Sequence, residues 1–271
     1  MKLSRRVKLG NAQLDEAAKP IAIRTVEIRE AAESFSTVNL EGVDGQRVTG
    51  HRRDTLDVSV KFGIDIGKRN LEERAEALEA AVAWAAKARK ENGGAWMTVN
   101  WKPKKQLRVY LATPPAEGDL WDWTKDFEIV FRAFNVPYWQ DVEETSLAFP
   151  IGNAGSASIS VPGTATTKAN VTMYNNTTYT INAPSITVAG KTMAFEGLAL
   201  AGYETLEIDH TAEDLLRIRI KSTGGSYRNV MSKRTAGSDH DFILEPGNRT
   251  VTFSTGGRNV KVTASVRGRY L

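Results

Sequence analysis

Hydrophobic and polar residues alternate along a long stretch in the first half of the chain. In residues 56–66, "LDVSVKFGIDI", an apolar side chain stands at every second position from Leu56 to Ile66. A period of two is typical of a β-strand with one buried face, so the pattern predicts a strand here. Shorter runs rich in β-branched and apolar residues predict further strands at 21–28, 33–40, 95–101, 106–112 and 127–134.

Residues 71–91, "LEERAEALEAAVAWAAKARKE", follow a helical period instead. Asn70 stands where an N-cap would accept amide hydrogen bonds, and Glu73 completes a capping-box pattern. The two glycines at 93–94 are typical of a helix end. The stripe expected to face the core consists of Leu71, Ala75, Leu78 and Val82, with Ala81, Trp84 and Ala88 beside it.

The two halves of the chain differ in pattern. Strands, one helix and more strands in the first half predict an α+β domain in which the helix packs on a sheet. After about residue 142 the runs are short, β-branched and alternating, with Gly, Pro, Asn and Ser between them, which predicts an all-β sandwich or jelly roll. The segment "TAEDLL", 211–216, holds the one weak helix signal of this half.

The junction is expected in "FNVPYWQDVEE", residues 134–144. All six tryptophans lie at or before residue 139, as expected if the aromatic core of one domain closes there. We therefore predict two domains, residues 1–141 and 142–271. A turn-rich arm, "EGVDGQRVTGHRR" at 41–53, is expected to interrupt the first.

Composition narrows the class of protein. Hydrophobic residues make up 41% of the chain and charged residues 25%, a balance typical of globular proteins. No apolar run approaches the length of a membrane span, and the basic N-terminus lacks the apolar region of a secretory signal. With no cysteine, the chain has no disulfides, thiolate catalysis or cysteine-based metal sites.

The net charge of +4 is small, and "WKPKKQLR" at 101–108 is its densest basic stretch. Four cations beside a tryptophan are able to follow a phosphate backbone. A solvated turn between two strands explains the same residues, and we favour that interpretation.

Acids stand beside imidazoles at Asp209-His210 and at Asp239-His240-Asp241. Histidine and carboxylate are ordinary metal ligands. However, neighbours in a strand point to opposite faces, so polar turns are the favoured explanation and no metal site is predicted.

Catalytic patterns are weak. A glycosidase needs two carboxylates at a defined spacing, and nothing marks such a pair among Glu143, Glu144, Glu204, Glu207 and Asp209. The sequence contains no nucleophile elbow, Walker loop or dinucleotide fingerprint. We predict a protein without catalytic residues and without a cofactor.

Several stretches together resemble the distal tail protein family of long, flexible-tailed bacteriophages. Residues 40–64 look like the family's Gly-x-Asp-Gly turn and the long strand after it. Residues 70–112 are similar to its helix, glycine turn and strand pair, and 127–141 to its strand ending in Pro-Tyr-Trp. Residues 186–210 and 238–255 resemble its C-terminal sandwich.

The resemblance implies a structural protein of the phage tail tip. The first domain would form a ring, typically a hexamer, that joins the tail tube to the baseplate or tail-tip and adsorption proteins. The second, galectin-like domain would project outward. Implied partners are other copies of the chain, the tail tube protein, a tail-associated lysin or baseplate hub and a receptor-binding protein. DNA would only pass through the channel, and no membrane is involved. The protein would be made in the host bacterial cytoplasm and carried in the virion.

The expected ring also suggests an interface. A flat amphipathic strand such as 56–66 is prone to aggregate unless it is covered or paired with another chain. The arm at 41–53 leads into it, so its cations Arg47, Arg52 and Arg53 are the candidate subunit-interface residues. The alternative is a carbohydrate-binding module that uses the second domain, although that half contains no tryptophan for stacking on sugars.

Overall fold

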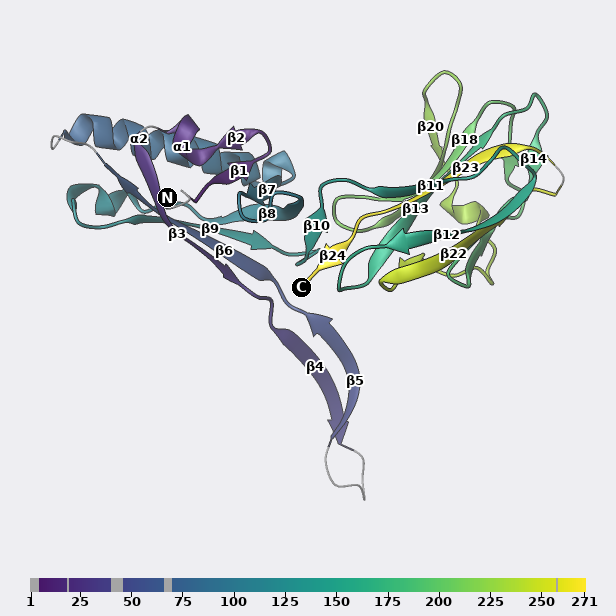
Figure 1. Ribbon diagram of the computed structural model, residues 1–271, viewed down its shortest axis with the longest axis horizontal. Helices are drawn as coiled ribbons and strands as arrows, with labels where there is room; N and C mark the ends of the chain where they lie inside the picture. Colours follow the sequence, from purple (N-terminus) through teal and green to yellow (C-terminus); the bar gives the residue numbers. More distant parts are fainter. Residues whose placement is uncertain (1–4, 19, 40–45, 66–69, 257) are drawn as a thin grey trace. The chain divides into compact units, whose positions relative to one another are not determined.

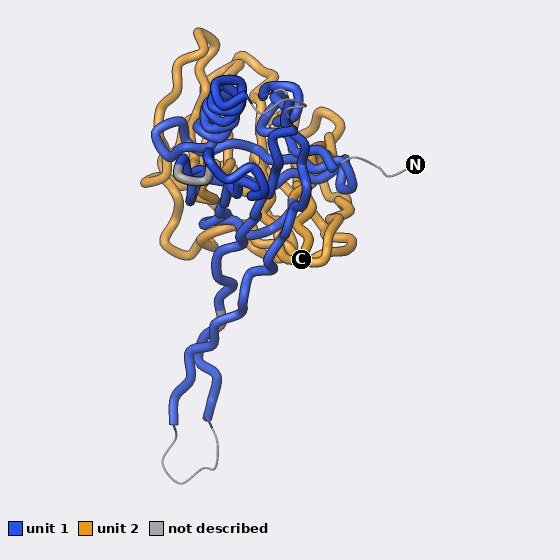
Figure 2. The backbone as a smooth tube through the Cα atoms, turned by 90° about the vertical axis from the view of Figure 1, so that its left-hand side faces the viewer, with its two compact units in different colours: residues 1–139 blue, residues 140–271 orange. Residues whose placement is uncertain are grey.

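The computed structural model describes residues 5–18, 20–39, 46–65, 70–256 and 258–271. The chain divides into two compact units, residues 1–139 and 140–271 (Figures 1 and 2). It is mostly β, with several antiparallel sheets and one main helix, as the sequence predicts.

The first unit is built on one antiparallel sheet with the strand order β2-β1-β7-β8-β9-β6-β3. A single-turn helix, α1 (Leu14–Ala17), follows β2. The strands of the sheet are β1 (Val7–Leu9), β2 (Ala12–Gln13), β3 (Ile21–Arg29), β6 (Leu56–Ile64), β7 (Ala95–Val99), β8 (Lys105–Thr113) and β9 (Phe127–Ala133).

Strand β6 lies inside this sheet, paired with β3 on one side and β9 on the other. Its alternating residues from Leu56 to Phe62 are buried, and Phe62 stacks on Phe127 of β9 at 5.6 Å between ring centroids. The sequence predicts that strand 56–66 needs either cover or pairing with another chain. Because both edges of β6 are paired within the unit, the strand itself gives no argument for an interface with another chain. Ile66 lies outside the described residues.

The main helix, α2 (Leu71–Ala85), lies along one face of the sheet (Figure 1). Asn70 caps it as predicted, because its side-chain oxygen accepts from the amides of Glu72 at 3.1 Å and Glu73 at 3.4 Å. Two 3-10 turns follow, η1 (Ala86–Ala88) and η2 (Lys90–Asn92). Gly93 and Gly94, at φ +72° and +73°, then end the helical segment in the left-handed conformation that glycine tolerates best.

The buried face of α2 is rotated from the expected stripe. Leu78 is buried as predicted, but Ala75 and Val82 are only half-buried. Trp84 packs edge-on against Phe131 at 5.7 Å and donates its indole N–H to the carbonyl of Ala12 at 2.8 Å. The buried residues are Arg74, Ala77, Leu78, Ala81, Trp84 and Ala85.

A two-stranded hairpin projects from the first unit (Figure 2). It consists of β4 (Glu33–Asn39) and β5 (Gln46–Arg53), which pair only with each other among the described strands. The sequence predicts a turn-rich arm over 41–53, whereas 46–53 is a strand. Strand β4 opposite supplies a hydrogen-bonding partner for these polar residues. Residues 41–45 of the expected arm lie outside the described part of the chain.

The second unit contains two larger antiparallel sheets. One has the order β11-β23-β13-β18-β19-β20, with strands at Thr145–Ala148, Val260–Val266, Thr167–Asn175, Thr205–His210, Leu216–Lys221 and Tyr227–Asn229. The other has the order β12-β22-β15-β16, with strands at Ala154–Val161, Gly247–Ser254, Ser185–Val188 and Lys191–Ala194. The remaining short elements of the chain are β10 (Trp139–Asp141), β14 (Ile181–Asn182), β17 (Ala199–Leu200), β21 (Ile243–Leu244), β24 (Arg269–Tyr270), η3 (Glu117–Trp121) and η4 (Met231–Lys233).

Inward-facing residues of both sheets form one hydrophobic core, which explains the alternating pattern of this half. Phe149 and Phe253, for example, meet edge-on at 5.2 Å. The weak helix signal at 211–216 is wrong. That segment turns, with the Thr211 hydroxyl accepting from the amide of Glu213 at 3.2 Å, before β19 begins.

Candidate functional site

The projecting hairpin is the first candidate interaction surface. Its root is well held: the amide of Asp54 donates to the carbonyl of Ala32 at 2.8 Å, and the Ser34 hydroxyl donates to the Asp54 carboxylate at 2.5 Å. Further out, the register shifts between Ser36 and Thr37, which is the mark of a β-bulge. A bulge increases the local twist of the hairpin.

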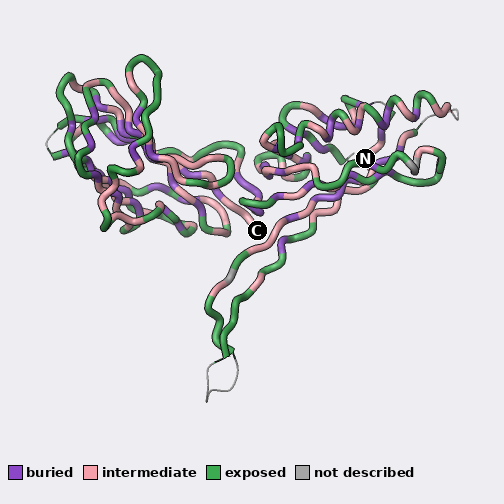
Figure 3. Tube along the Cα trace, turned by 180° about the vertical axis from the view of Figure 1, so that it is seen from behind, coloured by how far each residue is buried: buried purple, intermediate pink, exposed green. Residues whose placement is uncertain are grey.

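Beyond its root, the hairpin is exposed on both strands (Figure 3). Three apolar side chains stand in solvent there, with exposed fractions of 57% for Phe35, 42% for Val38 and 55% for Val48. An isolated two-stranded hairpin is at best marginally stable in water. Exposed apolar residues on such a hairpin are typical of a surface that another chain covers.

The three candidate interface cations occupy different environments. Arg47 is exposed on β5. Arg52 is also exposed, with 81% of its side chain accessible and its Nε 3.4 Å from the Asp54 carboxylate. Arg53 instead lies over the ring of Tyr138 at 5.1 Å, so it anchors the root of the hairpin to the first unit. Only Arg47 and Arg52 are presented outward.

The first half of the basic stretch, residues 101–104, lies in the turn between β7 and β8 that the sequence favours, whereas residues 105–108 already belong to strand β8. Lys102 lies over the ring of Trp139 at 5.1 Å, and Arg108 lies over the ring of Trp96 at 5.4 Å. Arg108 also donates to the carbonyl of Gly93. Two of the cations therefore make contacts within the first unit instead of forming one basic surface.

Four of the five carboxylates considered for catalysis, all except Glu143, are paired with an arginine. Nitrogen–oxygen distances are 2.9 Å for Glu204 with Arg228, 2.8 Å for Glu207 with Arg219, 2.7 Å for Asp209 with Arg217 and 3.0 Å for Glu144 with Arg267. Two of these pairs, Glu207 with Arg219 and Asp209 with Arg217, join the neighbouring strands β18 and β19. Such cross-strand pairs of opposite charge stabilise a sheet.

The two acid–imidazole motifs meet in a way that the sequence did not indicate. His210 turns away from its neighbour Asp209 and lies 2.7 Å from the Asp241 carboxylate through Nε2. Its Nδ1 lies 2.9 Å from the amide oxygen of Asn170. Lys168 lies 2.7 Å from the other oxygen of Asp241. Sequence reasoning considered each motif by itself and so missed the pair that joins them, His210 of the first motif with Asp241 of the second.

This cluster changes the acidity of Asp241. Burial alone would raise the pKa of its carboxyl, but hydrogen bonds from His210 and Lys168 outweigh it and lower the pKa from 3.8 to about 2. Lys168 is shared with Asp214, at 3.4 Å, and Asp214 is 2.6 Å from Arg269 of β24. The cluster thus ties β13, β18 and β24 together.

Within the described ranges, no group of three or more His, Cys, Asp and Glu side chains is placed to hold a metal ion. Of the helices in those ranges, none is long and apolar enough to cross a membrane.

The sequence matches no family model, and no curated protein matches it. The fold, in contrast, is similar over nearly the whole chain to a protein of a phage adsorption apparatus and to a chain of a phage baseplate.

The SPP1 Dit protein, described as a paradigm of the hub adsorption apparatus in phages that infect Gram-positive bacteria, has a TM-score of 0.70 with 11% identity, covering 98% of this chain and 99% of that one. A chain of the phage P2 baseplate in its activated conformation with calcium has a TM-score of 0.54 with 10% identity and covers 98% of each chain. The corresponding strontium structure has a TM-score of 0.52 with 10% identity and covers 97% of each chain. The expected resemblance is confirmed at the level of the fold.

Proposed function

We propose that this chain is a distal tail protein, a structural subunit of a phage tail tip. The observation that carries the proposal is the likeness to the SPP1 Dit protein, which covers 98% of this chain and 99% of that one. The match extends through both units at 11% identity, which supports the same two-unit architecture in both proteins and not only one domain of the same type. In this role the chain acts as a structural part of the virion, without catalytic residues or a cofactor.

The first unit would form the ring, typically a hexamer, around a central channel through which DNA passes. A ring of identical subunits is heterologous, so each chain must offer two different patches. The projecting hairpin supplies one patch, because its exposed Phe35, Val38 and Val48 need a cover. The outward cations Arg47 and Arg52 would set register against acids of the neighbouring subunit.

The second unit would serve as the galectin-like sandwich that projects from the ring. The tail tube protein, a baseplate hub or tail-associated lysin and a receptor-binding protein are the proposed neighbours. Its two sheets around one core support this assignment.

Molar mass in solution tests the proposal. Six chains of 29.8 kDa give a ring of about 180 kDa, and light scattering coupled to size exclusion should find this mass. Negative-stain images should show a ring with a central opening. A chain that remains monomeric at every concentration would contradict the ring.

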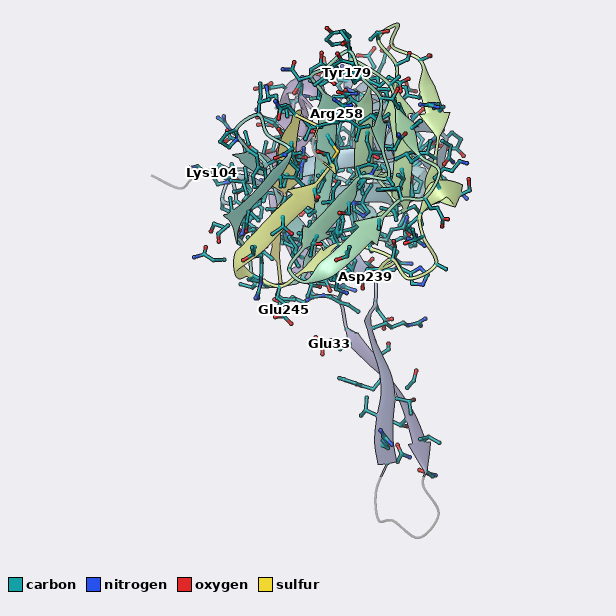
Figure 4. All side chains as sticks on the ribbon, turned by 90° about the vertical axis from the view of Figure 1, so that its right-hand side faces the viewer. Glu33, Lys104, Tyr179, Asp239, Glu245 and Arg258 are labelled. Atoms are coloured by element: carbon teal, nitrogen blue, oxygen red, sulfur yellow. The ribbon has the colours of Figure 1, made fainter. Side chains whose placement is uncertain are left out.

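Carbohydrate binding is the second candidate, favoured by one end of the second unit. Tyr179 and Tyr203 are 61% and 47% exposed. Arg258 lies over the Tyr179 ring at 4.7 Å, and both residues are labelled in Figure 4. Exposed aromatic rings are able to stack on sugars. Glycan-array binding that Tyr179→Ala abolishes would support it, and no binding to any glycan would remove it.

A further inference from the structure

Strand β12 is an unusual edge strand. It pairs only with β22 among the described strands, in an unbroken register from Ala154 opposite Ser254 to Val161 opposite Gly247. In an antiparallel edge strand, about half of the residues direct their N–H and C=O groups away from the sheet. The strand thus presents an unbroken row of backbone hydrogen-bonding groups.

Two other edge strands, β3 and β16, carry the usual protections against pairing, and β12 does not. Strand β3, at the edge of the first sheet, carries Arg24, Glu27 and Arg29. At the opposite edge of its own sheet, β16 is only four residues long and begins with Lys191. Strand β12 has eight residues, "AGSASISV", with no charge and no proline. Short length and charge are the usual protections of an edge strand.

One face of β12 and of the strand beside it carries no charge. Ser156, Ser158 and Ser160 are exposed on one face of the strand. Opposite them on β22 stand Thr252, Thr250 and Asn248, again without charge. An added strand would meet no like charge and no bulky side chain on this face.

The opposite face of β12 leaves the core incompletely covered. A side chain at Gly155 would meet Phe253 at 2.7 Å, so this position must stay small. Ala157 packs against the core while partly exposed, and so does Leu147 of β11, which contacts β12. Apolar side chains on an added strand would cover these residues.

We propose that the free edge of β12 binds an extended segment of another protein, which adds a strand to the sheet. The segment would be uncharged, with apolar side chains at every second position and small polar ones between. A second copy of the chain is disfavoured as occupant, because antiparallel pairing of β12 with itself requires a two-fold axis that neighbours in a ring do not share. This choice of occupant rests on the proposed ring.

Residues 250–255 of the chain itself, "TVTFST", provide a probe. Apolar and small polar side chains alternate in this segment, as the proposed occupant requires. In the folded chain, most of these residues pair with β12 along the edge opposite to the free one. A fluorescent, end-capped peptide of this sequence is titrated with the full chain and followed by anisotropy. The comparison probe is the same peptide with N-methyl groups at two adjacent positions, which interrupts hydrogen bonding along both its edges.

Two matched variants locate the binding edge. Ser158→Lys places a charge on β12, and Thr250→Lys places the same charge on the same face one strand further in, directly opposite. Both positions are exposed, so both variants should keep the wild-type circular dichroism. Ser158→Lys should weaken peptide binding by about tenfold or more, and Thr250→Lys by less than about twofold.

The proposal is overturned if the peptide does not bind, if the methylated peptide binds equally well, or if the two variants behave alike. Light scattering on the same samples measures the oligomeric state, so the β12 site and the proposed ring are tested separately. A monomeric chain that binds the peptide in the expected pattern contradicts the ring and supports the β12 site. A dimer that Ser158→Lys dissociates shows that the occupant is a second copy and overturns the proposed partner.

Discussion

Arg74 is buried on the inner face of α2, although arginine side chains are rarely buried in proteins. Its guanidinium lies 4.8 Å from the ring of Trp123 and 5.2 Å from that of Phe127, and it donates to the carbonyl of Asp122 at 2.8 Å. The aromatic rings and the carbonyl thus replace much of the water that the cation loses. This contact fastens the helix to the segment before β9.

Leu78, one turn further along the helix, provides a direct test of the packing. It is only 3% exposed, so Leu78→Ala should lower the free energy of unfolding by about 2–5 kcal/mol. Urea denaturation followed by tryptophan fluorescence measures this, because all six tryptophans lie in the first unit. The exposed neighbour Glu79→Ala is the control. A loss below about 0.5 kcal/mol for Leu78→Ala, the range of ordinary surface substitutions, would contradict its assigned burial.

Asp241 gives the second unit a dependence on acid pH. Its pKa is lowered from 3.8 to about 2 in the folded state, so its carboxylate stabilises the fold above pH 3.8, and this contribution disappears as the pH falls through about 2. The shift corresponds to about 2 kcal/mol. We expect Asp241→Asn to destabilise the unit by about this amount at pH 7, and the difference from wild type to shrink toward pH 2.

Circular dichroism during urea denaturation at several pH values measures this difference. Glu245→Gln is the control, because its carboxylate is 76% exposed and its pair with Arg249 should contribute little. A difference between Asp241→Asn and wild type that stays constant from pH 7 to pH 2 would show that the cluster does not depend on the charge of Asp241.

At the scale of elements, the hairpin of β4 and β5 is separable from the sheet that carries it. Strands β3 and β6, which flank the hairpin in sequence, pair with each other inside the first unit. At the root of the hairpin, the amide of Asp54 donates to the carbonyl of Ala32 at 2.8 Å. The hairpin therefore adds little to the core of the unit, as its exposure indicates (Figure 3).

This geometry predicts that the hairpin can be deleted without unfolding the first unit. Replacing residues 33–53 by an Asn-Gly turn should leave the first unit folded, because the ends already lie at hydrogen-bonding distance. Ring assembly should be lost. Tryptophan fluorescence and light scattering report the two properties separately. An excised chain that still forms the ring would remove the hairpin from the interface.

A charge reversal probes the same hairpin with less disturbance. Arg47→Glu with Arg52→Glu should weaken ring assembly by about tenfold or more, and the effect should diminish at high salt, because both cations are exposed. Lys87→Glu with Lys104→Glu changes the charge of the first unit equally at exposed positions outside the hairpin. Equal assembly of the two double variants would show that the hairpin cations do not contribute.

At the scale of the whole molecule, the junction follows the closing of the first core. Trp139 is buried in the first unit, whereas the next residues belong to the second. Asp141 donates its amide to the carbonyl of Gly268 at 3.0 Å and accepts from the Tyr270 hydroxyl at 3.0 Å. The C-terminal strand therefore holds the start of the second unit.

We accordingly expect fragments 1–139 and 140–271 to fold separately, since each unit has its own core. Fragment 1–139 should form the ring, and fragment 140–271 should be a monomer. Circular dichroism and light scattering on each fragment are the measurements. A fragment 1–139 that folds but stays monomeric while the full chain assembles would place the ring contacts in the second unit.

Local patterns of the sequence were enough to predict several elements. The main helix is one of them, with its cap at Asn70 and its glycine end. These features depend on residues only a few positions apart, so the sequence alone was enough to recognise them. The buried alternation of β6 and the change in composition near residue 139 were visible for the same reason. Fold class and the resemblance to distal tail proteins followed from the order of these elements.

Only the tertiary structure decided which strands lie inside a sheet and which lie at its edge. The sequence of β6 predicts a strand that must be covered or paired, without indicating by what, and β3 and β9 of the same unit pair both its edges. The sequence of β12 carries no such signal, yet one of its edges is unpaired among the described strands. His210 and Asp241 meet although 31 residues separate them. Such pairings depend on strand order, which is set by long-range packing, and periodicity within one segment contains no information about it.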